Sequence, residues 1–442
     1  MACTYGNYTQ CGYMSATVSS NSDGSLTVSF TFTPANSMLE SEERLQRALN
    51  DAGNLATGKC LEQFDSDGTP LLVGGEKFSS KGRQPKGYQT PYGEVSIERH
   101  VYQSAKGGAT FCPLEVSGRV VRTATPLFAR QVAFKYGAMN STLAVADLVG
   151  HGRALARSYL QELAADVASV AIEKEAVWSY VPSVAMEPEV NTIGVGVDGT
   201  CVLFCEEGYR QVMVGTIALY DGDGERLHTT YVAQAPEKGK ASFFEKMERE
   251  LAQVRRRFPQ ARVAGVADGA HDHWEWLEAR STWQVLDFWH ASEYLSGASF
   301  AMARGQAERE CWLEDACHRL KHDSGGAEAL LAEMEGALPS AKGAGKEAVL
   351  KAISYFTSHL SRMKYALYLA MRLPIGSGVT EAACKSVVKE RMSGSGMKWR
   401  SFGAQHVLAL RALIKTTDRW EQFWHKISRF GFCQIRGPHS TN

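Results

Sequence analysis

The order of strand-like and helical segments between residues 191 and 290 constrains the fold more than any other feature. Three apolar, strand-like segments follow one another closely, at 191–198, 210–220 and 226–235. The double turn Asp221-Gly222-Asp223-Gly224 between the last two predicts an antiparallel meander. A helical segment, the strand RVAGVAD, a short helix at HDHWEWLEAR and the strand TWQVLDFW come next. Together they predict an α/β domain with a mixed five-stranded sheet.

The segments on either side of this domain have different patterns. Residues 16–35 alternate polar and apolar positions, which is typical of a hairpin of half-buried strands, and a helix is expected over 38–52. Helical spacing over 293–370 predicts an all-helical insertion, broken by Gly-rich loops at Gly325-Gly326 and at KGAGK. We therefore expect six parts: 1–58, a hairpin and helix of no assigned role; 59–125, a small β-rich module; 126–188, a helical segment; 189–292, the first part of the sheet domain; 293–370, the insertion; 371–432, the helix with Glu381 and the C-terminal helices of the sheet domain.

The composition is that of an ordinary folded protein and argues against a strongly basic, a membrane-spanning or a disulfide-rich protein. The 442 residues are 44% hydrophobic and carry 48 basic and 48 acidic side chains, so a nucleic-acid partner must be argued from local patches. The N-terminus lacks a basic stretch followed by an apolar one, and no segment approaches the ~18 apolar residues of a membrane span. We expect a cytoplasmic protein. Ten scattered cysteines indicate reduced, mostly buried thiols rather than a disulfide framework.

Three acidic residues stand where functional groups are expected. Asp198 and Asp268 each end a predicted strand and precede a glycine, and Glu381 lies in the first turns of a helix. Functional residues gather at strand ends in open α/β sheets. Hard divalent cations prefer such oxygen ligands. The alternatives are ordinary Asp-Gly turns and an exposed Glu381 paired with Lys385 at i+4. Glu390 is nine residues further on and should lie on the opposite helix face.

Basic residues near Glu381 are candidates for phosphate contacts. They are Lys385, Lys389, Arg391, Lys398 and Arg400, with Trp399 available to stack on a base. The ordinary reading of such residues is a solvated surface. Weaker candidates are the Arg255-Arg256-Arg257 run, a helix-turn-helix within 140–178, and the module at 59–125 with Lys77, Lys81, Arg83 and Lys86.

The cysteines and histidines form weaker constellations. Cys311, His318 and His322 share a helix face, but zinc normally takes four ligands and no fourth is in view, so packing and a solvated face are favoured. Cys201 and Cys205 are expected in the core of the sheet.

Several strings resemble the bacterial insertion-sequence transposases of the DDE type, and specifically the ISKra group. They are VADGAHDHWEW, LDFWHASEYL, GSGVTEAACKSVVKERMSGSGMKW, GAQHVLALRALIKTTDRWEQFW and YQTPYGEVSIERHVYQ, within about residues 57–430. The resemblance implies an RNase H-like catalytic domain in which Asp198, Asp268 and Glu381 hold two Mg²⁺ ions, for which Mn²⁺ can substitute. It implies that water and then a DNA 3′ hydroxyl attack phosphodiesters.

The resemblance has further implications for residues and partners. Asp287 and His290 match an Asp-x-x-His signature of related groups, whose role would be to orient a ligand, to contact the flanking nucleotide or to form a buried structural hydrogen bond. The implied partners are double-stranded DNA, at the element ends and the target, and other copies of the chain; no small-molecule cofactor is implied. Cys60 and Cys112 stand alone where relatives often carry paired cysteines.

Two other functions compete with transposition. One is a nuclease of the same fold that hydrolyses DNA or RNA without joining ends. The other is a DNA-binding relic without activity, for which a damaged carboxylate set would be expected. All three acids are intact in this sequence.

Overall fold

The computed structural model describes residues 16–184 and 189–432. Its contacts divide the described chain into two compact units. One contains the residues up to Glu173 together with those from Phe423 onward, and the other runs from Lys174 to Gln422. The boundary falls inside the helical segment expected at 126–188, and a second one falls within the last helix.

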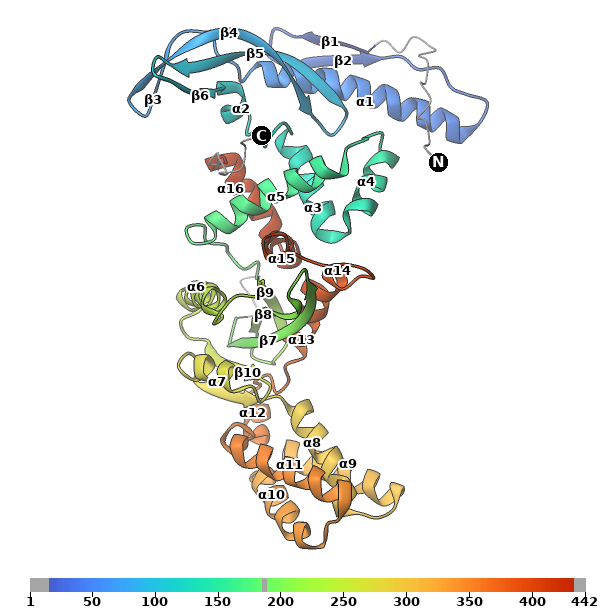
Figure 1. The fold of residues 1–442 in the computed structure, drawn as a ribbon, viewed down its shortest axis with the longest axis vertical. Helices are drawn as coiled ribbons and strands as arrows, with labels where there is room; N and C mark the ends of the chain where they lie inside the picture. The colour runs from blue at the N-terminus through green and yellow to red at the C-terminus, as the bar shows by residue number, and fades with distance from the viewer. Residues whose placement is uncertain (1–15, 185–188, 433–442) are drawn as a thin grey trace. The chain divides into compact units, whose positions relative to one another are not determined.

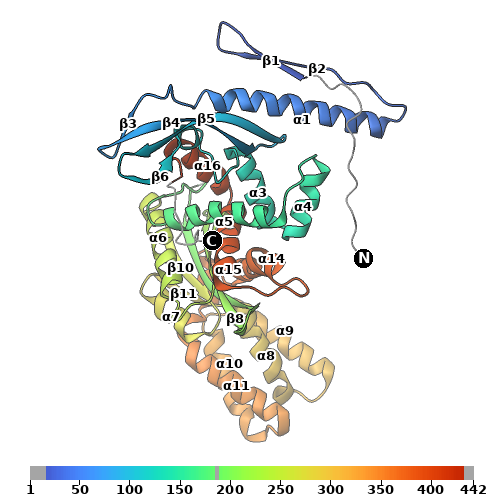
Figure 2. The ribbon, with the colours of Figure 1, turned by 45° about the horizontal axis from the view of Figure 1, so that its top comes forward.

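The first unit begins with a hairpin and a long helix (Figures 1 and 2). Strands β1 (Ala16–Ser20) and β2 (Leu26–Phe30) pair antiparallel, as predicted, but their side chains are mostly exposed rather than half-buried. Helix α1 (Met38–Glu62) continues beyond the predicted end at residue 52. It does so because its second half packs on strand β5, where an added Cβ at Gly58 would lie 3.0 Å from Val95 Cγ2.

An antiparallel sheet, four helices and the end of a fifth complete the described part of this unit. The strands are β3 (Leu71–Val73), β4 (Glu76–Gln89), β5 (Glu94–Ser104) and β6 (Gly107–Phe111), in that order across the sheet. This confirms a β-rich module, whose core includes Leu61, Tyr88 and Leu114. After the short helix α2 (Pro113–Ser117), the predicted helical segment is present as α3 (Pro126–Ala138), α4 (Ser141–Gly150) and α5 (Arg157–Lys174). The end of α16 (Arg419–Phe430) belongs to the same unit.

The second unit is built on the predicted mixed sheet. Its strands are β7 (Thr192–Phe204), β8 (Gly208–Tyr220), β9 (Arg226–Gln234), β10 (Arg262–Ala267) and β11 (Trp283–Leu286), ordered β11-β10-β7-β8-β9. Strands β7, β8 and β9 form the antiparallel meander, while β10 and β11 run parallel to β7. Helices α6 (Ala241–Arg257) and α7 (His271–Glu278) pack on one face, because Met247 lies against Gly215 and Leu277 against Gly265.

Strand β7 is longer than the sequence predicted, and this changes the position of Asp198. The expected strand ended at Asp198, but β7 continues to Phe204 because β8 pairs with it residue for residue from Thr192 to that point. Its parallel neighbour β10 pairs only as far as Gly196. Asp198 therefore lies within a strand, just beyond the level at which the neighbouring strand stops.

The insertion is helical throughout, as predicted, and forms a group of helices beyond the sheet (Figure 1). Its helices are α8 (Phe288–Met302), α9 (Gln306–His322), α10 (Gly326–Ala337), α11 (Gly343–His359) and α12 (Tyr365–Ala370), with short 3₁₀ turns at Leu338–Ser340 and Leu360–Arg362. The KGAGK segment opens α11 rather than forming a loop. Buried residues of the insertion and the sheet form one continuous core.

The chain returns to the sheet through a helix with a π-helical turn. Helix α13 (Gly378–Ala383) continues as the π turn η3 (Cys384–Lys389) and α14 (Glu390–Met392), followed by α15 (Ser401–Lys415). Glu381 therefore lies in the first turns of a helix, as predicted. None of the helices in residues 16–184 and 189–432 is long and apolar enough to cross a membrane.

Candidate functional site

The helix carrying Glu381 packs on the sheet face to which Asp198 belongs. Side chains alternate between the faces of a strand, so positions 194, 196 and 198 of β7 share one face. Gly196 lies directly under Thr380 of α13, and the hydroxyls of Thr380 and Thr216 on β8 are hydrogen-bonded at 2.7 Å. Glycine at position 196 allows this close approach, so Asp198 and Glu381 lie on the same side of the sheet.

The strand register places Asp268 beside Asp198. Val266 of β10 is paired with Gly196 of β7, and each aspartate follows two residues later. Both aspartates therefore reach the same level and the same face, because alternation is preserved between parallel neighbours. Asp268 follows the last residue of β10 directly, so its predicted strand-end position is confirmed.

The three predicted acidic residues line one cleft of about 260 Å³, together with three cationic or titratable groups. The main polar residues of its lining are Asp198, Asp268, Glu381, His290, Lys385 and Lys389. These residues come from β7, the end of β10, the start of α8 and the α13–η3 helix. Segments far apart in the sequence thus converge on a site that combines carboxylates with positive charge.

Hydrogen bonds from neighbouring side chains orient two of the carboxylates, those of Glu381 and Asp198. Glu381 Oε1 accepts a hydrogen bond of 2.7 Å from Ser377 Oγ, in contrast to the pairing with Lys385 that we considered as the ordinary alternative. Asp198 Oδ2 accepts a bond from the Cys384 thiol at 3.3 Å. Burial and the neighbouring Asp198 raise the pKa of Cys384 above its usual range, so the thiol keeps the proton that it donates.

Asp268 is held by the turn that follows it. Its Oδ1 accepts the backbone N–H of Ala270 at 3.2 Å and lies 3.4 Å from Nδ1 of His273, a buried side chain. Interaction with His273 and the Ala270 N–H outweighs partial burial and lowers the pKa of Asp268. The carboxylate is therefore ionised at neutral pH and available to a cation or a proton donor.

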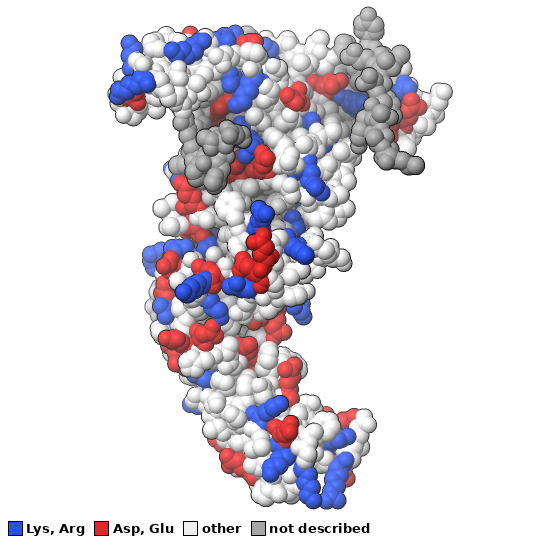
Figure 3. All heavy atoms as spheres, in the orientation of Figure 1, with Lys and Arg blue, Asp and Glu red and all other residues white. Residues whose placement is uncertain are grey.

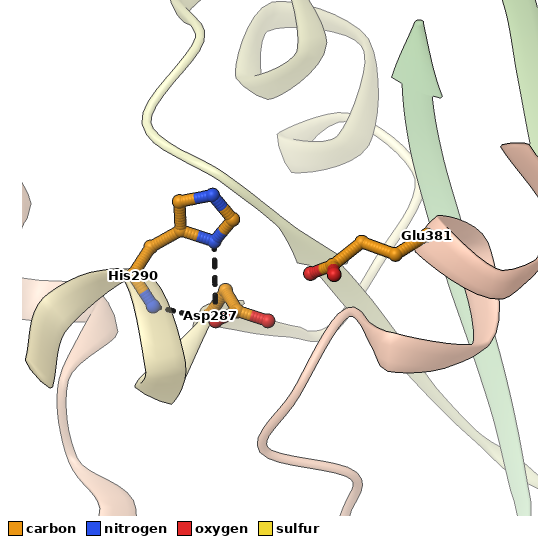
Figure 4. Close-up of side chains that lie close together, drawn as sticks. All are labelled: Asp287, His290 and Glu381. Atoms are coloured by element: carbon orange, nitrogen blue, oxygen red, sulfur yellow. Dashed lines mark hydrogen bonds and ion pairs between the residues drawn. The ribbon is translucent and has the colours of Figure 1, made fainter. Parts of the chain in front are cut away.

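Asp287 and His290 form a second pair beside Glu381 (Figure 4). Asp287 is completely buried and accepts the backbone N–H groups of His290, at 2.8 Å, and of Ser377. Burial alone would raise the pKa of Asp287, but the contacts with His290 and Ser377 hold it near 2. The Asp287 carboxylate, 3.3 Å from His290 Nδ1, raises the pKa of His290 to about 9 despite partial burial. His290 is thus a cation at neutral pH.

The tightest group of potential metal ligands differs from the predicted triad. Among the described residues, that group is Asp287, His290 and Glu381, whose ligand atoms lie within 4.8 Å of one another. His290 Nδ1 is turned toward the Asp287 carboxylate, 3.3 Å away. Both Asp287 oxygens already accept backbone N–H groups. The pair therefore supports the site, and the carboxylate oxygens of Asp198, Asp268 and Glu381, which line the cleft, fit a hard cation better.

The basic residues near Glu381 lie in three different settings. Lys385 and Lys389 line the cleft, and Lys398 and Arg400 are exposed. Arg391, however, is buried with its guanidinium over the Trp399 ring, against the expectation that it contacts phosphate.

Trp399 is also engaged within the fold. Its indole N–H bonds Met392 O at 2.9 Å, and its backbone pairs with Leu203 and Cys205 at the end of β7. It is not free to stack on a base in this conformation. Glu390 is not among the residues that line the cleft, and it pairs with Arg411 and Lys415.

The cysteine and histidine groups that the sequence suggested form no metal site among the described residues. His318 and His322 have ring centroids 4.8 Å apart, but they and Cys311 are exposed and belong to no metal-ligand group among the described residues. Cys201 is exposed and Cys205 half-buried, so the prediction that both lie in the core is wrong. The described cysteines are free thiols, as expected, but only Cys112 and Cys384 are buried.

Candidate phosphate contacts outside the cleft are partly engaged. Lys86 pairs with Glu115, and Arg83 donates to a carbonyl of the neighbouring strand, while Arg255, Arg256 and Arg257 are exposed at the end of α6.

Sequence reasoning missed the residues behind the carboxylates, namely His273, Ser377 and Cys384. The glycines at 194 and 196, four and two residues before Asp198, were a usable signal, because small residues on one strand face often permit close packing of another element. A scan against models of known protein families finds no match, and no curated protein is significantly similar in sequence.

Proposed function

We propose that this protein is a DDE-type transposase of a bacterial insertion sequence, with an RNase H-like catalytic domain. It would bind the terminal repeats of its element as double-stranded DNA, cleave their 3′ ends and join them to target DNA. Because two ends must be joined, it would act as an oligomer on DNA, in the cytoplasm. The resemblance to the ISKra group leads to this proposal.

One structural observation supports it above the others. Three acidic side chains from separate segments, Asp198, Asp268 and Glu381, line a single cleft with Lys385 and Lys389. Carboxylates and lysines in one cleft suit a phosphodiester, because the carboxylates can hold cations and the lysines can contact phosphate oxygens. The mixed five-stranded sheet is compatible with an RNase H-like domain.

Each group of residues in the cleft would have its own role in the reaction. Asp198, Asp268 and Glu381 would hold two Mg²⁺ ions, which Mn²⁺ could replace; when bound, such ions activate the attacking oxygen and stabilise the leaving one. Lys385 and Lys389 would attract the DNA backbone, and the His290 imidazolium would add positive charge beside it. In Figure 3, acidic and basic side chains are interspersed over the face drawn, so attraction would depend on these local groups.

A cleavage and joining assay tests the proposal. Asp198→Asn, Asp268→Asn and Glu381→Gln should each abolish Mg²⁺-dependent cleavage of DNA carrying the sequences that flank this gene, while binding to those ends persists. Glu390→Gln is the matched control, because Glu390 lies on the same helix segment but is paired with Arg411 and Lys415 outside the cleft.

The outcomes separate the competing functions. Joining of pre-cut 3′ ends by the native chain, lost in Glu381→Gln, supports a transposase. Cleavage without joining would favour the nuclease. Binding without any chemistry in the native chain would indicate an inactive relic, and cleavage retained in a triad variant would remove that residue from the metal site.

A further inference from the structure

The two ends of the helical insertion meet at Asp287. The insertion begins with Phe288, whose backbone N–H donates to Ile375 O at 3.0 Å, where the chain returns. Asp287 itself follows β11, and its backbone N–H donates to Ala267 O of β10 at 3.0 Å. The residue that leaves the sheet is therefore also the point at which the insertion closes.

The Asp287 side chain completes this closure. It is fully buried, and it accepts the N–H of Ser377, a residue 90 positions away in the sequence. Its other oxygen accepts the N–H of His290 and so caps helix α8. A buried carboxylate is stable only when such donors satisfy it. The side chain thus joins the start of the insertion to the segment just after it.

Ser377 connects Asp287 to Glu381 through hydrogen bonds. The Ser377 carbonyl accepts the N–H groups of Thr380 at 2.7 Å and of Glu381 at 3.0 Å, so it forms the first turn of α13. The Ser377 hydroxyl donates to Glu381 Oε1. Figure 4 shows the Glu381 carboxylate directed toward Asp287. Any movement of Ser377 would therefore change both the helix start and the direction of that carboxylate.

We propose that Asp287 is a positioning residue: it latches the two ends of the insertion together and, through Ser377, holds Glu381 in the cleft without binding the metal itself. The latch follows from the hydrogen bonds alone. Its consequence for metal binding rests on the proposed function of Glu381.

The latch can be tested without any catalytic assay. In Asp287→Asn the side chain keeps its shape but retains only one acceptor oxygen for two backbone donors. Backbone hydrogen exchange over residues 377–383 should accelerate about tenfold or more, while exchange in the β7–β8 pair remains unchanged. Asp323→Asn is the matched control, because Asp323 is an exposed acid of the same insertion.

Mn²⁺ binding by the full chain tests the effect on the site. Substitution of a residue that orients a ligand typically weakens metal affinity about 10–100-fold. Calorimetric titration of Asp287→Asn with Mn²⁺ should therefore show that loss of affinity with unchanged stoichiometry. Ser377→Ala, which keeps the N–H donated to Asp287 but removes the hydroxyl bonded to Glu381, should weaken Mn²⁺ binding without accelerating exchange at residue 377.

Each result decides between these readings. Unchanged exchange over 377–383 in a folded Asp287→Asn chain would overturn the latch. Loss of one bound Mn²⁺ would overturn the positioning role and make Asp287 a ligand. If the native chain binds no Mn²⁺, the metal site of the proposed function fails, and hydrogen exchange alone then supports or overturns the latch. If Asp287→Asn does not fold, the proposal stands or falls on whether Ser377→Ala weakens Mn²⁺ binding.

Discussion

Replacing Gly196 by alanine should push the helix that carries Glu381 away from the strand that carries Asp198. A Cβ added at position 196 would lie 1.9 Å from Thr380 Oγ1 and 2.9 Å from Thr216 Oγ1. The two threonine side chains are almost completely buried and bonded to each other, so neither can rotate into solvent. The added methyl must displace α13 or break the threonine pair.

The size of the effect follows from these contacts. Thr380 Oγ1 would have to move roughly 1.5 Å to reach an ordinary contact distance of ~3.5 Å. Overpacking a buried site typically costs about 1–3 kcal/mol, and loss of the hydroxyl hydrogen bond adds about 1 kcal/mol. We expect Gly196→Ala to lower the free energy of unfolding by about 2–4 kcal/mol. A shift of about 1 Å in Glu381 should also reduce the proposed cleavage activity by about 100-fold.

A double-mutant cycle in urea tests this reasoning. Thr380→Ala removes the clashing hydroxyl, so Gly196→Ala should cost markedly less stability in that background than in the native chain. Gly403→Ala is the control, because that helical position is open and the change should stabilise by up to about 1 kcal/mol. If the effects of Gly196→Ala and Thr380→Ala add to within about 0.5 kcal/mol, the two positions are not coupled and the packing argument is refuted.

Two further predictions concern Gly269, which directly follows Asp268, and His290. An added Cβ at Gly269 would lie 2.7 Å from Tyr355 Cε2 and 3.0 Å from His359 Nε2. Gly269→Ala should therefore lower the free energy of unfolding in urea by about 1–3 kcal/mol. Unchanged stability would show that α11 does not hold this turn. Since the pKa of His290 rises from 6.5 to about 9 in the folded chain, its pairing with Asp287 stabilises fully below pH 6.5 and ceases to do so as the pH rises through 9. The stability gap between the native chain and His290→Gln should shrink over that range in urea titrations, and a constant gap would contradict the ion pair.

Local patterns in the sequence predicted the elements because each pattern reflects how one element meets its core. The alternation in the meander and the helical spacing of the insertion both correspond to observed elements. The end of β7 was mispredicted because the glycine after Asp198 indicates a turn only where no partner strand continues. Here β8 continues to pair up to Phe204, and that information lies in another segment.

The surroundings of the site depended on contacts between distant residues. Arg391 and Trp399 have the composition of a DNA contact, yet they pack on each other and on the end of β7. Asp287 is joined to Ser377 across 90 residues, and no local spacing indicates such a bond. Sequence spacing can assign a residue to an element and a face, but it does not show which distant element covers that face.

The sequence by itself determined the types of element, their order along the chain and the positions of Asp268 and Glu381 near element ends, because short-range periodicity and turn residues encode these. The tertiary structure decided the rest. It brought Asp198, Asp268 and Glu381 to one cleft through the β7–β10 register and the packing of α13 on Gly196. It also placed Asp287 and His290 beside them and buried Arg391. The physical reason is that packing and buried hydrogen bonds join residues that are far apart in the chain.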